Sequence, residues 1–145
     1  MKMQYKYYTL PLNSISLIKN KPIDTCSIQD SIANYIHLIM TTRFGECSFD
    51  SFFGCAIWNV DFNNIASDNK LRVIISDSLV KSIKQYEKRL MGIEIQVDIE
   101  QEEIHNKQKK SRIKKRVYVL IKGVVRKTNE DFNYNEYFYI APLSY

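Results

Sequence analysis

Three acidic residues of this sequence, Glu46, Asp50 and Glu87, are of a type that could carry out catalysis. Two carboxyl groups at a set separation can act as acid and nucleophile in glycoside hydrolysis, so Glu46 could work with either Asp50 or Glu87. A simpler explanation is available, because Arg43 and Arg89 lie close to Glu46 and Glu87 in the sequence, and such neighbours commonly form ion pairs. We therefore predict that the chain is not an enzyme and has no catalytic residues.

The histidines and cysteines do not have the spacing of a metal site. His37 and His105 lie far apart in the sequence, and Cys26, Cys47 and Cys55 include no pair separated by two residues. An odd number of cysteines also argues against a disulfide framework and favours a reducing compartment. The few glycines form no phosphate-binding loop. We therefore expect free thiols, no metal and no cofactor.

The composition fits a single globular domain. The chain has 145 residues, of which 45% are hydrophobic and 26% charged, so it can bury a core of its own. No apolar run is long enough to cross a bilayer, and lysine, tyrosine and proline interrupt the apolar residues at the N-terminus. These features predict a cytoplasmic protein with neither a membrane span nor a secretory signal.

Positive charge is concentrated in one segment, Lys107–Arg116, which has seven basic residues and no acidic one. The whole chain carries +5, so its other residues together are slightly acidic. The basic segment could bind phosphate groups, with tyrosines as stacking surfaces for bases. A solvated hairpin tip explains the same pattern and is the commoner case. A nucleic-acid-binding module using residues 107–116 is therefore an alternative, and we expect that nucleic acid is not a partner.

The chain divides into an N-terminal arm, residues 1–26, and one α+β domain, residues 27–145. Two prolines in the arm favour an extended conformation, and its tyrosines could pack on a partner or on the domain itself. Ser27 and Asp30 have the spacing of a capping box, which predicts that a helix begins there. The apolar residues that follow at helical spacing are Ile28, Ile32, Tyr35, Ile36, Ile39 and Met40.

A second helix is predicted after an aromatic loop. The segment from Phe44 to Trp58 breaks the helical period with two glycines, so we expect a tight, partly buried loop that leads into a helical turn. Apolar spacing then predicts a helix from Asp68 to the Met91–Gly92 pair, with a possible break at Ser76–Asp77.

Three strands complete the predicted domain. Strict alternation of apolar and polar residues predicts strands over 93–100, 117–125 and 134–140, with a polar loop that contains the basic segment between the first two. Their adjacent order favours an antiparallel meander. The expected fold is therefore α+β, with two main helices packed on a small, mainly antiparallel three-stranded sheet and an extended N-terminal arm.

Two motifs resemble a known family. "LIMTTRFGECSFDSFFG", Leu38–Gly54, and "IKQYEKRL", Ile83–Leu90, are similar to the two motifs of the lysozyme-like baseplate wedge family of contractile tails, in the same order. That family includes the phage tail baseplate wedge protein and the TssE subunit of type VI secretion systems. The resemblance extends over about residues 27–140. Lys88 stands where the family usually has proline, so the helix could continue through Lys88, and Cys47-Ser48 replaces a common arginine-proline.

The resemblance implies which residues bind partners. In this family the Glu-x-Arg motif is implied to hold neighbouring baseplate subunits, and the sheet is implied to dock the sheath by strand exchange. An alternative is that Glu87 and Arg89 only tie the second helix to loops of their own domain. The predicted partner-binding residues are Tyr86, Glu87, Arg89 and Leu90, with Gly45, Glu46 and Gly54 shaping the adjoining loop.

The resemblance also implies a function. We expect a structural baseplate wedge subunit of a contractile injection machine, most closely TssE-like, that clamps other wedge subunits and templates sheath assembly. The expected partners are TssF-like and TssG-like wedge proteins and sheath subunits, in a cytoplasmic assembly that can dock at the inner membrane. A lysozyme-like hydrolase is a second alternative. The sequence leaves open whether the particle is a secretion system, a phage tail or a related machine.

Overall fold

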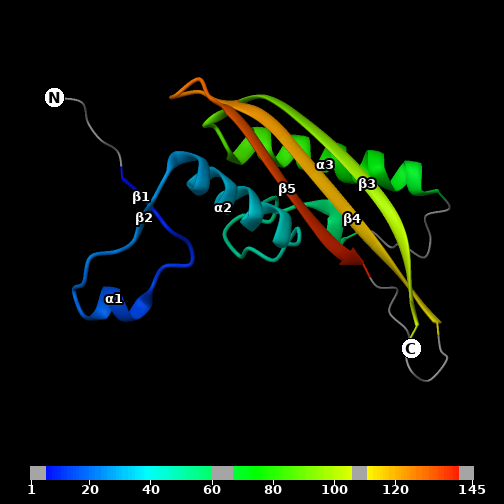
Figure 1. Cartoon of the computed structure of the whole chain (residues 1–145), viewed down its shortest axis with the longest axis horizontal. Coiled ribbons are helices and arrows are strands. Elements are labelled where there is room, and N and C mark those ends of the chain that lie inside the picture. Colours follow the sequence, from blue (N-terminus) through cyan, green and yellow to red (C-terminus); the bar gives the residue numbers. More distant parts are fainter. Residues whose placement is uncertain (1–5, 60–66, 106–110, 141–145) are drawn as a thin grey trace.

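The domain is a three-stranded antiparallel sheet with two long helices against one face (Figure 1). A computed structural model describes residues 6–59, 67–105 and 111–140, and gives the backbone alone for residues 102–114 within these ranges. In the part of the chain described, no helix is both long and apolar enough to cross a membrane. The main elements are α2 (Ile28–Thr41), the 3-10 helix η1 (Ala56–Trp58), α3 (Asp68–Tyr86), β3 (Leu90–His105), β4 (Ser111–Val125) and β5 (Asp131–Ile140).

Helix α2 begins at the predicted capping box. The backbone N–H of Asp30 donates to the Ser27 hydroxyl at 3.0 Å, and the Ser27 N–H donates to the Asp30 carboxylate at 3.4 Å. These bonds satisfy donors that the first turn of a helix leaves free. The buried face of the helix consists of Ile32, Ile36, Ile39 and Met40.

Helix α3 differs from the prediction in two ways. It runs without a break through Ser76–Asp77, because apolar residues on both sides of that point lie on one buried face. It also ends at Tyr86, so the predicted end at Met91–Gly92 and the continuation through Lys88 are wrong. Leu90 already belongs to β3, which leaves a tight junction between the helix and the strand. The buried residues of this helix are Leu71, Ile75, Leu79, Ser82 and Ile83.

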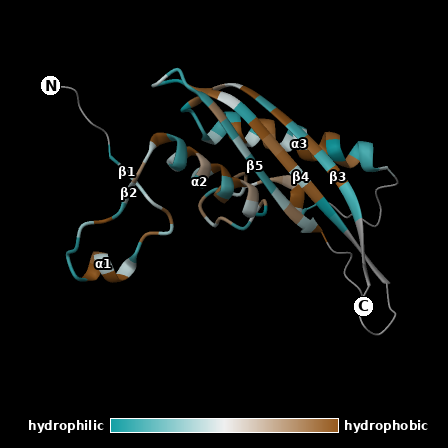
Figure 2. Cartoon of the chain, in the orientation of Figure 1, coloured by the Kyte–Doolittle hydropathy of each residue, from teal (hydrophilic) through white to brown (hydrophobic). Residues whose placement is uncertain are grey.

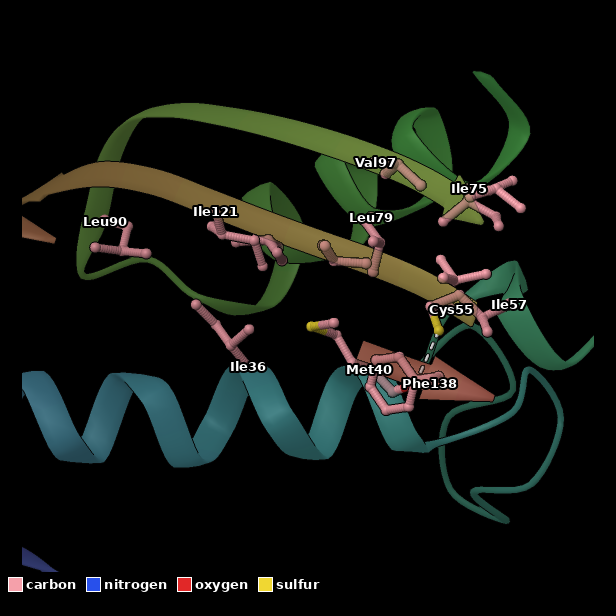
Figure 3. Close-up of a cluster of buried hydrophobic side chains, with 14 of the residues drawn as sticks. Ile36, Met40, Cys55, Ile57, Ile75, Leu79, Leu90, Val97, Ile121 and Phe138 are labelled. Carbon is pink, nitrogen blue, oxygen red and sulfur yellow. Dashed lines mark hydrogen bonds between the residues drawn. The ribbon is translucent and has the colours of Figure 1, made fainter. Parts of the chain in front are cut away.

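The strands form the predicted meander in the order β3–β4–β5. The alternation seen in the sequence is confirmed, since Val97, Val119 and Ile121 point to the buried face while their polar neighbours point away. Figure 3 shows this core between the sheet and α2, and Figure 2 shows hydrophilic and hydrophobic residues mixed along the strands. The core residues of the sheet are Leu90, Val97, Ile99, Val117, Val119, Ile121, Val125, Phe132, Phe138 and Ile140.

The described part of the basic segment is a strand, which corrects the predicted polar loop there. From Ser111 onward its backbone belongs to β4, and the register places Arg116 opposite Glu100. These two side chains form an ion pair at 2.6 Å, and Lys115 donates to Asp68 at 2.8 Å. Opposite charges directly across a strand pair stabilise the pairing. The side chains of residues 107–114 lie outside the described part of the chain.

The aromatic segment forms the expected tight loop before η1. The Cys55 thiol at its end is buried and donates to the Met40 carbonyl at 3.2 Å (Figure 3). Burial raises the pKa of Cys55 to about 11, so the thiol stays protonated at neutral pH. Free thiols at Cys26, Cys47 and Cys55 agree with the sequence prediction.

The N-terminal arm has short elements of its own and lies to one side of the sheet (Figure 1). Strands β1 (Tyr7–Tyr8) and β2 (Thr25–Cys26) pair antiparallel, and helix α1 (Ser14–Ile18) lies between them in the sequence. Tyr7 attaches the arm to the domain, because its ring centroid lies 5.8 Å from the Arg89 guanidinium and 5.9 Å from the Lys127 ammonium. The boundary between residues 1–26 and 27–145 as separate units stays a prediction.

Gly54 is expected to be the glycine least tolerant of substitution. Its φ is +125°, and an added Cβ would lie 2.5 Å from the Thr42 carbonyl oxygen. We expect Gly54→Ala to lower the free energy of unfolding by about 2–4 kcal/mol in urea titrations, because the backbone must move. Gly45→Ala is the control: its φ is +81° and nothing lies within 4 Å, so about 1 kcal/mol of backbone strain is expected. Equal losses in the two variants would contradict the steric explanation.

Candidate functional site

The junction between α3 and β3 contains the Glu-x-Arg motif. Tyr86 is the last residue of α3, Leu90 is the first of β3, and the Glu87 N–H still donates to the Ile83 carbonyl at 2.8 Å. Glu87 is buried, with 2% of its surface exposed. A buried carboxylate needs partners that replace its lost hydration.

Arg89 supplies all of the hydrogen bonds described for the Glu87 carboxylate. Oε1 accepts from the Arg89 backbone N–H at 2.9 Å and from Nε at 2.8 Å, and Oε2 accepts from Nη2 at 2.5 Å. The hydrogen bonds with Glu87 raise the pKa of Arg89 above its usual value. This bidentate, charge-assisted geometry fixes the guanidinium plane.

Arg89 also connects the junction to two other parts of the chain. Its Nη1 donates to the Ser31 hydroxyl of α2 at 2.8 Å, and its guanidinium lies over the Tyr7 ring. The Arg89 side chain remains 31% exposed, whereas that of Glu87 is 1% exposed. Arg89 is therefore the charged member of the motif that another protein can reach.

The loop between α2 and η1 contains most of the other motif, Leu38–Gly54, and hydrogen bonds within this motif close the loop. The Arg43 backbone N–H donates to the Glu46 carboxylate at 2.9 Å, so Glu46 binds backbone at this position. The Gly45 N–H donates to the Ser51 carbonyl at 2.9 Å across the loop. Gly54 lies against the backbone of Thr42, where a side chain has no room. The two glycines and Glu46 thus contribute contacts within this loop.

Asp50 links this loop to the junction, a role that the sequence did not reveal. The Tyr86 hydroxyl donates to Asp50 Oδ2 at 2.8 Å, and Asp50 Oδ1 accepts from the Phe52 N–H at 3.0 Å. Burial and the bond to Asp50 raise the pKa of Tyr86 to about 12. The Phe53 and Tyr86 rings pack edge to face, with their centroids 5.0 Å apart. The two sequence motifs therefore meet in one place.

The predicted site residues are not equally accessible. Leu90 is 2% exposed and belongs to the hydrophobic core, so any effect on a partner acts through the position of the junction. Glu46, Asp50 and Glu87 all accept hydrogen bonds from groups of their own chain. Within the described residues, no group of histidine, cysteine and acidic side chains could hold a metal ion.

Replacing Arg89 and replacing Glu87 should lower the free energy of unfolding by different amounts. We expect Arg89→Met to lower the free energy of unfolding by about 3 kcal/mol, because it leaves the buried Glu87 carboxylate without its partner. Glu87→Gln should cost only about 1–2 kcal/mol, since the partly exposed guanidinium can be hydrated and an amide oxygen still accepts from the backbone. Urea titration of both variants measures this. A larger loss of unfolding free energy in Glu87→Gln than in Arg89→Met would contradict this explanation. It would show that leaving Arg89 without its partner costs more than leaving Glu87 without its partner.

The comparisons with known proteins agree with this geometry. The family model described as "Baseplate wedge protein gp25" matches residues 26–130. A solved structure from Geobacter sulfurreducens, for whose protein a role as tail lysozyme has been suggested, has a TM-score of 0.60 and 23% sequence identity. The match covers 85% of this chain and 100% of that chain, and at this identity it shows the fold alone. No curated protein matches the sequence. Because the family model covers most of the domain, this chain belongs to the baseplate wedge family, whose members are structural parts of contractile tails.

Proposed function

We propose that this chain is a non-enzymatic, TssE-like wedge subunit of a type VI secretion system. Family membership supports a structural role in a baseplate. The observation that carries the finer assignment is the junction, where a buried carboxylate holds a partly exposed arginine in one orientation. An arginine fixed in advance loses little conformational freedom when another protein binds it.

In this proposal the junction clamps TssF-like and TssG-like wedge proteins. The Arg89 guanidinium is the contact, and Glu87 sets its plane. Tyr86 and Leu90 hold the helix end and the strand start in place, while Gly45, Glu46 and Gly54 shape the adjoining loop. The bonds to Glu87 and Ser31 hold the guanidinium in one orientation, and its exposed part presents positive charge to the carboxylates and carbonyl oxygens of a partner.

The sheet offers a place for the sheath. Among the described strands, β5 (Asp131–Ile140) is paired with β4 and stands at the edge of the sheet. Such an edge accepts a foreign strand by β-augmentation. We propose that a sheath subunit adds a strand here, in a cytoplasmic baseplate docked at the inner membrane.

The basic segment gives little support to nucleic-acid binding. Lys115 and Arg116, its two residues with described side chains, form ion pairs with Asp68 and Glu100. Basic side chains bind nucleic acid because they replace the counterions of its phosphates. Basic side chains that are already paired with carboxylates of their own domain replace fewer of these counterions and so contribute less to binding. We therefore propose no nucleic-acid partner.

A structural role predicts that the folded protein does not hydrolyse peptidoglycan. Glu46 and Asp50 bind backbone N–H groups of their own loop, and Glu87 is saturated by Arg89, so none is placed as a free acid or nucleophile. Incubation with purified peptidoglycan should leave the turbidity unchanged over hours, with hen lysozyme as positive control. Clearing by protein whose circular dichroism shows it folded would overturn the structural assignment.

The clamp is tested by purifying the tagged chain with its co-expressed baseplate neighbours. We expect the wild-type chain to hold wedge proteins, and Arg89→Lys to weaken that binding at least about tenfold, since lysine keeps the charge but loses the guanidinium bonds to Glu87 and Ser31 that fix its orientation. Arg72→Lys is the matched control, because Arg72 lies at the other end of α3 and its hydrogen bonds to described residues are long, at 3.4 and 3.5 Å. Unchanged binding by folded Arg89→Lys would refute the clamp.

A further inference from the structure

We propose that Phe49 and Phe52, at the tip of the loop before η1, anchor an acidic, apolar segment of another baseplate protein. This inference rests on the proposed function and adds a second contact to the clamp. Phe49 is 96% exposed and Phe52 is 74% exposed. Large aromatic side chains at such exposure contribute almost nothing to their own core, and they are enriched at the centres of protein interfaces.

The two rings stand on a fixed loop. Asp50 accepts from the Phe52 N–H at 3.0 Å through its side chain and from the Phe53 N–H at 3.2 Å through its carbonyl. The Gly45–Ser51 bond closes the same loop. A loop held in this way presents its side chains to a partner without a large loss of entropy on binding.

A groove of about 450 Å³ lies between this loop and α3. It is lined by Phe44 and Phe52 on the loop side and by Ser78, Lys81 and Gln85 on the helix side. A volume of this size can take apolar side chains of a partner segment. Phe52 forms one wall of the groove, so a segment seated there contacts its ring directly.

The charge around the groove indicates what kind of segment fits. Among the described residues that line the groove, Lys81 is the one with a charged side chain. A partner with aspartate or glutamate beside its apolar residues would gain a favourable charge pair with Lys81.

The groove is continuous with the junction. Asp50 bonds to Tyr86, and Phe53 packs on the Tyr86 ring, so the loop and the end of α3 form one surface. A single partner can therefore contact Arg89 and the two phenylalanines together. That continuity is our reason for assigning the groove to a baseplate protein.

The first test removes the rings. We expect Phe49→Ser combined with Phe52→Ser to weaken binding of co-expressed wedge proteins at least about tenfold. The melting temperature should change by less than about 3 °C, since neither ring is buried. The control combines Val73→Ser with Ile18→Ser, which removes two side chains that are 58% and 82% exposed on other surfaces. This control should bind like the wild type.

A charge reversal tests the nature of the segment. Lys81→Glu should weaken binding severalfold and remove much of its salt dependence, because it places a negative charge beside the acidic segment. Lys70→Glu, an exposed reversal at the other end of α3, should bind like the wild type. Equal effects of the two reversals would overturn the acidic character of the partner.

A photo-crosslinker identifies the occupant. Phe52→p-benzoylphenylalanine keeps an aromatic ring, and illumination of the assembled complex should join it to a baseplate protein, in a peptide with both acidic and apolar residues. A cross-link to a second copy of this chain, or to its own arm, would overturn the inference. If the wild type holds wedge proteins and the Phe49→Ser, Phe52→Ser variant holds them equally, the inference fails while the proposed function stands. If the wild type holds none, both fail.

Discussion

The buried pair of Glu87 and Arg89 is the interaction on which the arrangement of this domain depends. Glu87 is almost completely removed from water, and Arg89 provides the three hydrogen bonds described for its carboxylate. Through Ser31 and Tyr7, the same arginine reaches α2 and the arm. Four separate parts of the chain, namely α2, α3, β3 and the arm, are therefore oriented by one guanidinium. Buried ion pairs often add little net stability, but they specify geometry where several elements must meet.

The Glu-x-Arg motif has two interpretations, one as a site of partner binding and one as a tie within the domain, and the geometry is compatible with both. The pair does tie the second helix to its own domain, because all of the hydrogen bonds described for it are within the chain. The same bonds leave part of Arg89 exposed in a fixed orientation, next to a loop whose phenylalanines face outward. A donor group that its own chain holds in one orientation loses little conformational freedom when a partner binds, and the bond to Glu87 holds Arg89 in this way. The internal structure and the proposed binding thus depend on one set of contacts.

The sequence predicted those parts of the fold that rest on local periodicity. The capping box at Ser27 and the alternation around Val97 and Val119 were correct, because each signal depends on residues close in the chain. The end of α3 was misplaced, since apolar spacing continues through Leu90 although that residue packs in the sheet. The extension of β4 to Ser111 was missed because Lys114, Lys115 and Arg116 follow one another in the sequence and interrupt the alternation of apolar and polar residues. The Asp50–Tyr86 bond joins residues 36 apart, which no local pattern reveals.

Lys88 shows which part of the motif determines the end of the helix. The resemblance to the family implies a proline at this position, and a proline would disfavour helical geometry in the residue before it. In this chain α3 ends at Tyr86 without that proline. The Lys88 ammonium donates to the Lys84 carbonyl at 2.9 Å, one of the acceptors that a helix end leaves free. The turn itself is held by the Glu87 carboxylate on the Arg89 N–H, a bond that needs no proline. The junction in this chain is therefore made by Glu87 and Arg89 without a proline between them, and Lys88 adds a bond to the helix end.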